Sequence, residues 1–473
     1  MSAAGPEGAR VSGEVNIAHV TLIAAAAAMG GFLFGYDSSV INGAVSAIQE
    51  RFQVSPAVTG LTVAAALLGS AVGAGIAGGL ADRVGRIRVM QLAGLLFAVS
   101  AIGSALPFTV WDLAVWRVVG GIAIGVASVI APTYIAEVSP PAYRGRLASL
   151  QQLAIVLGIA VSQLVNFALA ISAGGSALDP LGPLQAWQWM LGAELVPALI
   201  YIGLSLVIPE SPRYLARVGR DDQARAILAE IGEGDVEYRL SEIHRALGSE
   251  PRSRLKDLRQ GSFNLVPIVW IGMALSAFQQ LVGINVIFYY SASLWQSVGV
   301  QESNSLLLSL FTSVVNIVGT LIAIVLVDRA GRKPLLLTGS AGMAVALAVT
   351  AFAFSHARVA GEQADLPFVW ALVALTSAST FVLFFALSWG VVTWVLLGEI
   401  FPLRIRAAAM AVATATQWIA NWLVTVTFPS LRDWSLPGTY VIYTAFAVLS
   451  FIFVLRYIRE TKGRTLESMR ERL

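Results

Sequence analysis

Long apolar runs separated by short polar segments make up most of this chain. An α-helix needs about twenty apolar residues to cross the roughly 30 Å hydrocarbon core of a bilayer. Twelve runs of this kind span residues 17–45, 57–81, 88–106, 112–136, 146–172, 186–208, 264–298, 305–327, 334–355, 367–397, 407–430 and 437–458. The pattern predicts an all-α membrane protein with twelve transmembrane helices.

Two polar motifs occur once in each half of the chain. Asp82-Arg83-Val84-Gly85-Arg86 follows the second apolar run, and Asp328-Arg329-Ala330-Gly331-Arg332 follows the eighth. Similarly, Glu137-x-x-Pro140-x-x-x-Arg144 has a counterpart in Glu399-x-x-Pro402-x-x-x-Arg406. In a membrane protein, such a duplication is typical of a transporter in which two related bundles rock against each other.

The domain organisation follows from this duplication. We expect six-helix bundles over residues 1–208 and 263–458, a cytoplasmic linker over 209–262 and a cytoplasmic tail over 459–473. Residues 221–231 of the linker predict a short amphipathic helix, because apolar residues recur at helical spacing. The linker is either a solvated tether between the bundles or a gate that contacts the inner loops.

Composition and charge agree with a membrane protein. Hydrophobic residues make up 57% of the chain and charged residues 12%, with a mean hydropathy of +0.74, whereas soluble domains carry about 25% charged residues. Lys and Arg gather in the short loops after even-numbered runs, so the positive-inside rule places these loops and both termini in the cytoplasm of a multi-pass protein of the cell (inner) membrane. The net charge of +3 therefore does not predict nucleic-acid binding.

Cofactor chemistry is not expected. The chain has no cysteine, and its three histidines are scattered, so neither a disulfide nor a metal cluster is predicted. We see no nucleophile–base pair or phosphate loop either, which argues against an enzyme.

Two charged residues lie within apolar runs and are functional candidates, because ionisable groups are costly in a bilayer. Asp37 lies 17 residues beyond Val20 in the first run, and Arg117 lies 5 residues after Asp112 in the fourth. Since these runs cross in opposite directions, both side chains fall in the outer half of the membrane, at about 25 Å and 8 Å along their helices. Asp37 is then a proton carrier held ionised by Arg117, or the two form a permanent structural ion pair.

A further set of charges is expected to form ion pairs at the inner gate, which would break when the gate opens. Glu194, in the sixth run, is included as a buried acid that bonds to loops near the inner face. The set consists of Arg83, Arg86, Glu137, Arg144, Glu194, Arg213, Arg329, Arg332, Glu399 and Arg406.

Neutral amides and indoles recur at membrane depth. Gln279, Gln280 and Asn285 lie in the seventh run, where Gly283 permits a helix break that turns them toward one cavity. Other runs add Gln151, Gln152, Asn316, Trp389, Trp394, Gln417, Trp418 and Asn421. Amides that donate and accept, together with indole rings, suit a sugar better than a phosphate or an organic anion. The alternative is that the amides only join helices, at about 0.6 kcal/mol per bond.

The chain resembles the sugar porter family of the major facilitator superfamily over residues 20–470. The motifs that carry the resemblance are Ala81-Asp82-Arg83-Val84-Gly85-Arg86, Pro209-Glu210-Ser211-Pro212-Arg213-Tyr214-Leu215, Asp328-Arg329-Ala330-Gly331-Arg332-Lys333 and Glu460-Thr461-Lys462-Gly463. The resemblance looks closest to bacterial proton-coupled glucose and hexose carriers. It implies two six-helix bundles with a central sugar site and alternating access.

The resemblance also assigns residues. The implied sugar contacts are Gln152, Gln279, Gln280, Asn285, Asn316, Trp394 and Gln417, with Tyr289, Gly390, Trp418 and Asn421 less central. Asp37 occupies the acidic position of the proton symporters, and Arg117 matches its arginine partner. Ile159 stands where a xylose-preferring relative has Gln, which favours a hexose. Val391 replaces the Pro that many members have after Gly390, which weakens the expectation of a flexing tenth helix.

The predicted function is proton-coupled symport of a monosaccharide, glucose or a related hexose, into the cell. The partners are then the sugar, the proton and the lipid bilayer, and the protein is expected to act as a monomer without a cofactor. The alternative is a proton-independent uniporter in which Asp37 and Arg117 form a structural pair. A sugar sensor is disfavoured, because about fifteen residues follow the last run.

Overall fold

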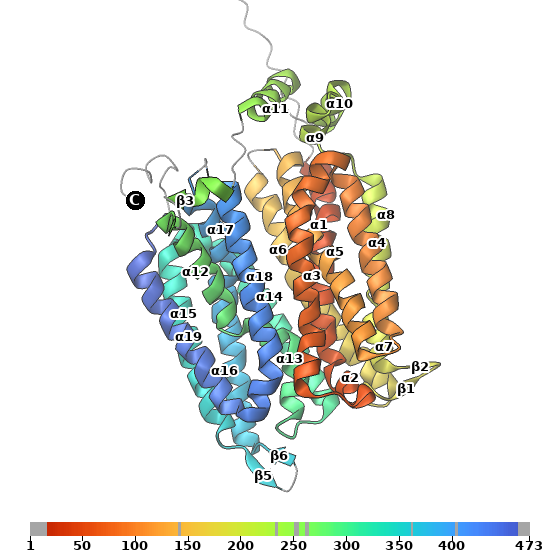
Figure 1. Ribbon diagram of the computed structural model, residues 1–473, viewed down its shortest axis with the longest axis vertical. Helices are drawn as coiled ribbons and strands as arrows, with labels where there is room; N and C mark the ends of the chain where they lie inside the picture. Colours follow the sequence, from red (N-terminus) through yellow and green to blue (C-terminus); the bar gives the residue numbers. More distant parts are fainter. Residues whose placement is uncertain are drawn as a thin grey trace, which may run out of the picture.

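The computed structural model describes residues 17–140, 143–231, 235–249, 255–260, 264–360, 363–402 and 405–461. Their long helices form two bundles that stand side by side, with the short helices α9, α10 and α11 beyond one end (Figure 1). We call this end the linker end and the opposite end the far end. Residues 1–16 of the expected first bundle lie outside the described residues, and so do residues 462–473 of the expected tail.

The first bundle is built from the first half of the chain. Its helices are α1 (Ile17–Val40), the 3-10 helix η1 (Ile41–Gly43), α2 (Val45–Phe52), α3 (Pro56–Val84), α4 (Arg86–Ala105), α5 (Val110–Val138), α6 (Arg144–Ala173), α7 (Ala186–Gly192) and α8 (Leu195–Val207). The antiparallel strands β1 (Pro180–Leu181) and β2 (Leu184–Gln185) form a hairpin at the far end (Figure 1).

The connecting segment contains α9 (Pro212–Arg217), α10 (Asp221–Glu230), α11 (Val236–Ser249) and the 3-10 helix η2 (Leu255–Leu258), followed by the paired strands β3 (Arg259–Gln260) and β4 (Asn264–Leu265). The helix predicted over 221–231 is confirmed as α10. It buries Ala224 and Leu228, as its apolar spacing requires.

The second bundle repeats the architecture of the first. Its elements are α12 (Pro267–Leu281), α13 (Ile284–Gln296), α14 (Glu302–Ala330), α15 (Arg332–Phe354), the paired strands β5 (Arg358–Ala360) and β6 (Gln363–Asp365), α16 (Phe368–Leu387), α17 (Trp389–Ile400), α18 (Arg406–Trp434) and α19 (Leu436–Tyr457).

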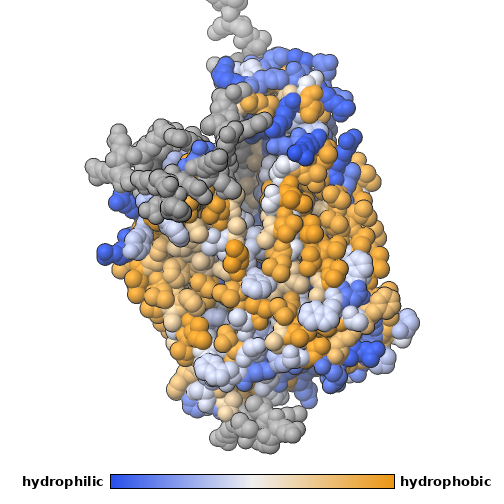
Figure 2. All heavy atoms as spheres, in the orientation of Figure 1, coloured by the Kyte–Doolittle hydropathy of each residue, from blue (hydrophilic) through white to orange (hydrophobic). Residues whose placement is uncertain are grey.

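The apolar character of these helices agrees with twelve membrane crossings. Eleven spans in the described residues are long and apolar enough to cross a bilayer. The twelfth helix, α18, is 29 residues long, and it is less apolar because it carries Gln417 and Asn421. Figure 2 shows a broad hydrophobic band across the visible face of both bundles, with hydrophilic residues toward the two ends.

Three spans are broken near their middles. Gly283, with φ of 84°, separates α12 from α13, so the break predicted there is confirmed. Glu194 lies in a second break between α7 and α8, which the sequence did not predict. Ser388 separates α16 from α17, so the tenth span bends although no proline follows Gly390.

Glycines allow α3 and α5 to approach closely. A Cβ atom at Gly121 of α5 would lie 1.9 Å from the Ala66 carbonyl oxygen, and one at Gly69 of α3 would lie 2.2 Å from the Val118 carbonyl oxygen. Small residues of this kind let backbones pack together where lipid gives no hydrophobic driving force. The first bundle therefore depends on the absence of side chains at this crossing.

Candidate functional site

Four of the predicted amides form one hydrogen-bonded cluster at the break between α12 and α13. Asn285 Nδ2 donates to Gln280 Oε1 at 2.6 Å, and Gln417 Nε2 of α18 donates to Gln279 Oε1 at 2.8 Å. Gln280 Nε2 lies 3.5 Å from Gln279 Oε1. On a regular helix Gln280 and Asn285 would diverge, and the left-handed Gly283 between them turns both side chains into the cluster.

The remaining sugar-site candidates are distributed over both bundles. Asn316 of α14 is buried, Gln152 of α6 is half-buried, and Gly390 of α17 is half-buried. Trp418 of α18 lies with its ring centroid 6.0 Å from that of Phe34 on α1. The set therefore includes a contact between the two bundles as well as the cluster on the second.

The two tryptophans of α17 have different surroundings. Trp389 is fully buried, and its indole donates to Ser340 Oγ at 2.9 Å, while its backbone carbonyl accepts from Gln279 Nε2 at 2.9 Å. Trp394 is 36% exposed. Trp389 therefore contributes a carbonyl group near the amides, whereas the ring of Trp394 is partly exposed.

Asp37 and Arg117 meet inside the first bundle. Arg117 Nη1 donates to Asp37 Oδ1 and, at 3.2 Å, to the Asp37 carbonyl oxygen. Both side chains are buried, so the predicted proximity of the two residues is confirmed. Asp37 Oδ2 has no hydrogen-bond partner within the part of the chain that the structure describes. A Cβ at Gly120 would lie 2.6 Å from this oxygen, so α5 closes over it without a side chain.

Glu194 belongs to this acidic centre and not to the inner gate. Its side chain is 3% exposed and lies near enough to Asp37 and Arg117 for electrostatic coupling to both. The sixth span enters from the far end, so Glu194, eight residues after Ala186, lies about 12 Å deep. The expectation that it bonds to loops near the inner face does not agree with this position, because the break between α7 and α8 lies in the half of the span nearer the far end.

Tyr289 connects the two groups of candidates. It is buried in α13, and its hydroxyl interacts with the side chains of Ser38 on α1 and Asn421 on α18. Ser38 follows Asp37 directly, and Asn421 lies one turn after Gln417 on the same helix face. Polar side chains of α1, α13 and α18 therefore meet around Tyr289.

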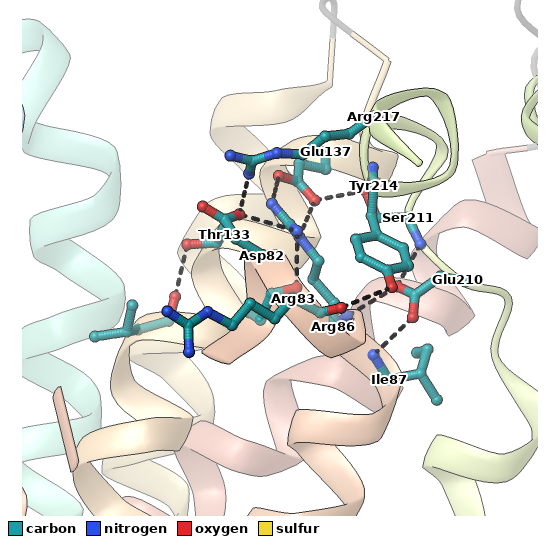
Figure 3. A network of polar contacts seen from close by, with 12 residues as sticks. Asp82, Arg83, Arg86, Ile87, Thr133, Glu137, Glu210, Ser211, Tyr214 and Arg217 are labelled. Atoms are coloured by element: carbon teal, nitrogen blue, oxygen red, sulfur yellow. Dashed lines mark hydrogen bonds and ion pairs between the residues drawn. The ribbon is translucent and has the colours of Figure 1, made fainter. Parts of the chain in front are cut away.

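The first duplicated motif forms a dense polar network at the linker end (Figure 3). Arg86 binds Glu137 with two bonds, from Nε to Oε2 and from Nη2 to Oε1, each of 2.9 Å. Ser211 Oγ donates to Glu137 Oε2 at 2.5 Å, and Asp82 pairs with Arg217 at 2.5 Å. The network ties α3, α4, α5 and α9 together.

The second copy of the motif makes the corresponding network in the other bundle. Arg332 binds Glu399 with bonds of 3.2 and 2.9 Å, and Thr461 Oγ1 donates to Glu399 Oε2 at 2.6 Å. Thr461 therefore takes the place that Ser211 has in the first network. The predicted pairing of arginine and glutamate is present, and each of these ion pairs lies within one bundle.

The other gate candidates lie near these networks. Arg83 accepts a bond from Tyr214 at its carbonyl oxygen, and Arg406 Nε donates to the Phe401 carbonyl oxygen at 3.1 Å. Arg213 is the second residue of α9, directly after Pro212, and Arg329 lies in the last turn of α14. Arg144 begins α6, and its side chain lies outside the described part of the chain.

Sequence reasoning missed two buried amides near the far end, Asn42 and Gln163. Asn42 Nδ2 donates to Gln163 Oε1 at 2.9 Å. A signal was present, because Gln163 lies eleven residues after Gln152, three helical turns along the same face. Asn42, five residues after Asp37, falls at the end of the first span.

The chain is similar to known transport proteins over nearly its whole length. A family model described as "sugar (and other) transporter" matches residues 23–473. A glucose transport protein of Synechocystis sp. is 52% identical over 456 residues, covering 96% of this chain and 97% of that protein. An arabinose-proton symporter of Bacillus subtilis is 36% identical over 456 residues, covering 96% and 95%.

A solved structure has the same fold. It is a structure of the xylose transporter from E. coli in a partially occluded inward open conformation, and its sequence is 35% identical to this chain. The TM-score is 0.82, with 95% of this chain and 100% of that chain covered.

Proposed function

Because this chain belongs to the sugar (and other) transporter family, we propose that it carries a monosaccharide together with a proton across the membrane by alternating access. The observation that carries this proposal is the pairing, in one chain, of the buried Asp37–Arg117 pair in the first bundle with the hydrogen-bonded amide cluster in the second. Asp37 lies on α1 and Asn285 of the cluster lies on α13, and these two helices contact each other.

The amide cluster is the proposed sugar site. Its members both donate and accept hydrogen bonds, so the hydroxyl groups of a sugar can replace the bonds that the amides make to one another. Gln279, Gln280, Asn285, Asn316, Trp394 and Gln417 would hold the sugar from the second bundle, and Gln152 from the first. Tyr289, Gly390, Trp418 and Asn421 border these residues.

Asp37 is the proposed proton carrier. Its Oδ1 faces Arg117, while Oδ2 is free of hydrogen bonds to the described residues, so a proton has an oxygen to bind. A neutral Asp37 no longer attracts the guanidinium of Arg117, and α1 can then shift against α5. One charge moving down 100 mV supplies about 2.3 kcal/mol, which corresponds to roughly fiftyfold accumulation of sugar if coupling is complete.

We assign the linker end to the cytoplasm and the far end to the outside, with both termini cytoplasmic in a multi-pass protein of the cell (inner) membrane. The basic motifs at the linker end support this orientation through the positive-inside rule. The bundles correspond to residues 1–208 and 263–458, the linker to 209–262 and the tail to 459–473. Each monomer holds a full set of these parts.

The contacts between bundles described here lie away from the linker end. Ala177 N donates to Glu302 Oε1 at 3.0 Å, and Gly60 of α3 packs against the Val426 carbonyl of α18. This arrangement corresponds to an inward-facing state. In this state the Arg86–Glu137 and Arg332–Glu399 pairs are both intact, each within its own bundle, so these pairs need not break when the linker end opens.

The test is uptake of radiolabelled glucose by the full chain in liposomes. With a proton gradient directed inward, we expect sugar to accumulate above its external concentration, and a protonophore should abolish this accumulation. Competition by hexoses and pentoses identifies the substrate, and Ile159 favours stronger competition by glucose than by xylose. Failure to take up any of these sugars would refute the transport of monosaccharides.

The second candidate is a proton-independent uniporter. The buried pairing of Arg117 with Asp37 favours it, because an opposite charge close by favours the charged form of a carboxylate. A uniporter would equilibrate sugar at the same rate with and without a proton gradient. It would also produce no alkalinisation outside the liposomes when sugar is added.

A further inference from the structure

Two side-chain amides of the first bundle reach the backbone of α13 in the second. Asn42 Oδ1 accepts from the Ala292 N–H at 2.9 Å, and Gln163 Nε2 donates to the Phe288 carbonyl oxygen at 3.4 Å. The two amides also bind each other, and Gln163 Nε2 donates to the Ser39 carbonyl oxygen at 3.2 Å. Both side chains are 1% exposed.

The two backbone groups that they bind belong to one turn of helix. In an α-helix, the N–H of residue 292 is the donor that faces the carbonyl group of residue 288. Asn42 and Gln163 therefore bind the donor and the acceptor of the same backbone hydrogen bond of α13. They hold the helix by its backbone, whatever side chains it carries.

A polar recess at the far end adjoins these bonds. Its volume is about 670 Å³, and it is lined by Ser46, Gln49 and Glu50 of α2 and by Ser293 and Gln296 of α13, among others. Since Ser293 follows Ala292 and Ser46 lies four residues after Asn42, polar groups of the recess lie near the bonds, and the recess has room for water. Backbone groups released from the amides can bind water there, so these contacts can open without leaving buried polar groups unpaired.

We infer that Asn42 and Gln163 form a latch, the Asn42–Gln163 latch, which holds α13 against the first bundle and stabilises the state that is closed at the far end. α13 is the half-span that begins at Gly283, directly after Gln279 and Gln280. Opening of the far end must break both bonds to α13. This inference rests on the proposed alternating access, and its residues lie outside the proposed sugar and proton sites.

The test measures the distance between the bundles at the far end. The chain has no cysteine, so spin labels at Glu50→Cys and Gln296→Cys, on opposite sides of the recess, need no background changes. The labelled full chain is placed in lipid nanodiscs without sugar or a proton gradient. We expect Gln163→Ala to increase the ratio of long to short distances about fivefold to tenfold, as the loss of the latch bonds implies.

Asn166→Ala is the matched control. Asn166 lies one turn further along α6, is fully buried, and donates to the Val40 carbonyl oxygen of its own bundle at 3.0 Å. It should leave the distances unchanged even if it lowers stability. Asn42→Ala provides an independent variant with the same expected shift as Gln163→Ala.

Unchanged distances in both latch variants would overturn the inference, as would an equal shift in Asn166→Ala. Because the readout is a distance in the absence of substrate, its failure is distinct from a failure of the transport assay.

Discussion

Glu210 and Glu460 occupy corresponding positions in the two bundles. Glu210 accepts from the backbone N–H groups of Arg86 and Ile87 at 3.0 and 3.2 Å, and Glu460 accepts from those of Arg332 and Lys333 at 3.0 Å each. The first N–H groups of a helix have no partner within it, and a carboxylate there is favoured by the helix dipole. Each glutamate therefore fixes the start of the helix that follows a duplicated motif.

Replacing either glutamate should destabilise its bundle. We expect Glu210→Ala and Glu460→Ala each to lower the free energy of unfolding by about 1–2 kcal/mol, the usual cost of losing a helix cap. The two effects should add, because the sites lie in different bundles. Denaturant titration of the detergent-solubilised protein measures them. Glu50→Ala, at an exposed acid of α2, is the control, and equal losses in all three variants would contradict the role of the caps.

Replacing the buried acid should separate sugar movement from proton movement. Asp37→Asn removes the titratable group but keeps an oxygen for Arg117, so we expect no accumulation driven by a proton gradient, while exchange of labelled for unlabelled sugar continues. Asp112→Asn is the control, because Asp112 is an acid of the same bundle that binds the Phe108 N–H at 3.0 Å near the far end. Continued accumulation by Asp37→Asn would disprove the assignment of the proton carrier.

The crossing of α3 and α5 should not tolerate a single added methyl group. Gly121→Ala places a Cβ 1.9 Å from the Ala66 carbonyl oxygen, so the helices must separate, at a cost of about 1–3 kcal/mol. Gly79→Ala, on the exposed side of α3, meets no atom of the described residues within 4 Å. We expect a lower thermal midpoint for Gly121→Ala alone. Equal midpoints would show that the helices do not cross so closely.

The two tryptophans of α17 should have different effects. Trp394→Ala should weaken sugar binding about tenfold or more, because it removes the proposed packing of the indole against the sugar ring. The loss of such a contact costs roughly 1–3 kcal/mol of binding free energy. Trp389→Phe loses the bond to Ser340 and should lower stability while leaving the dissociation constant nearly unchanged. Equilibrium binding of labelled glucose and thermal unfolding separate the two effects. Weaker sugar binding in Trp389→Phe, with lower stability alone in Trp394→Ala, would contradict the roles assigned to the two residues.

Much of the fold could be predicted from local pattern. The helical spans follow from runs of apolar residues, and the break at Gly283 follows from a residue that adopts positive φ without strain. The breaks at Glu194 and Ser388 could not be predicted in this way, because each depends on how neighbouring helices satisfy the released backbone groups. The difference in environment between Trp389 and Trp394 is likewise invisible in sequence.

The sequence by itself determined the twelve spans, the duplication of charged motifs and the kinds of side chain available for a neutral, hydroxylated ligand, because these depend on hydropathy, spacing and chemical type. Only the tertiary structure decided which partners these side chains meet. It buried Glu194 in the same bundle as Asp37, kept each arginine–glutamate pair within its own bundle, and joined Asn42 and Gln163 to α13. Contacts between residues more than fifty positions apart depend on how the helices pack, and that packing has no local signature in the chain.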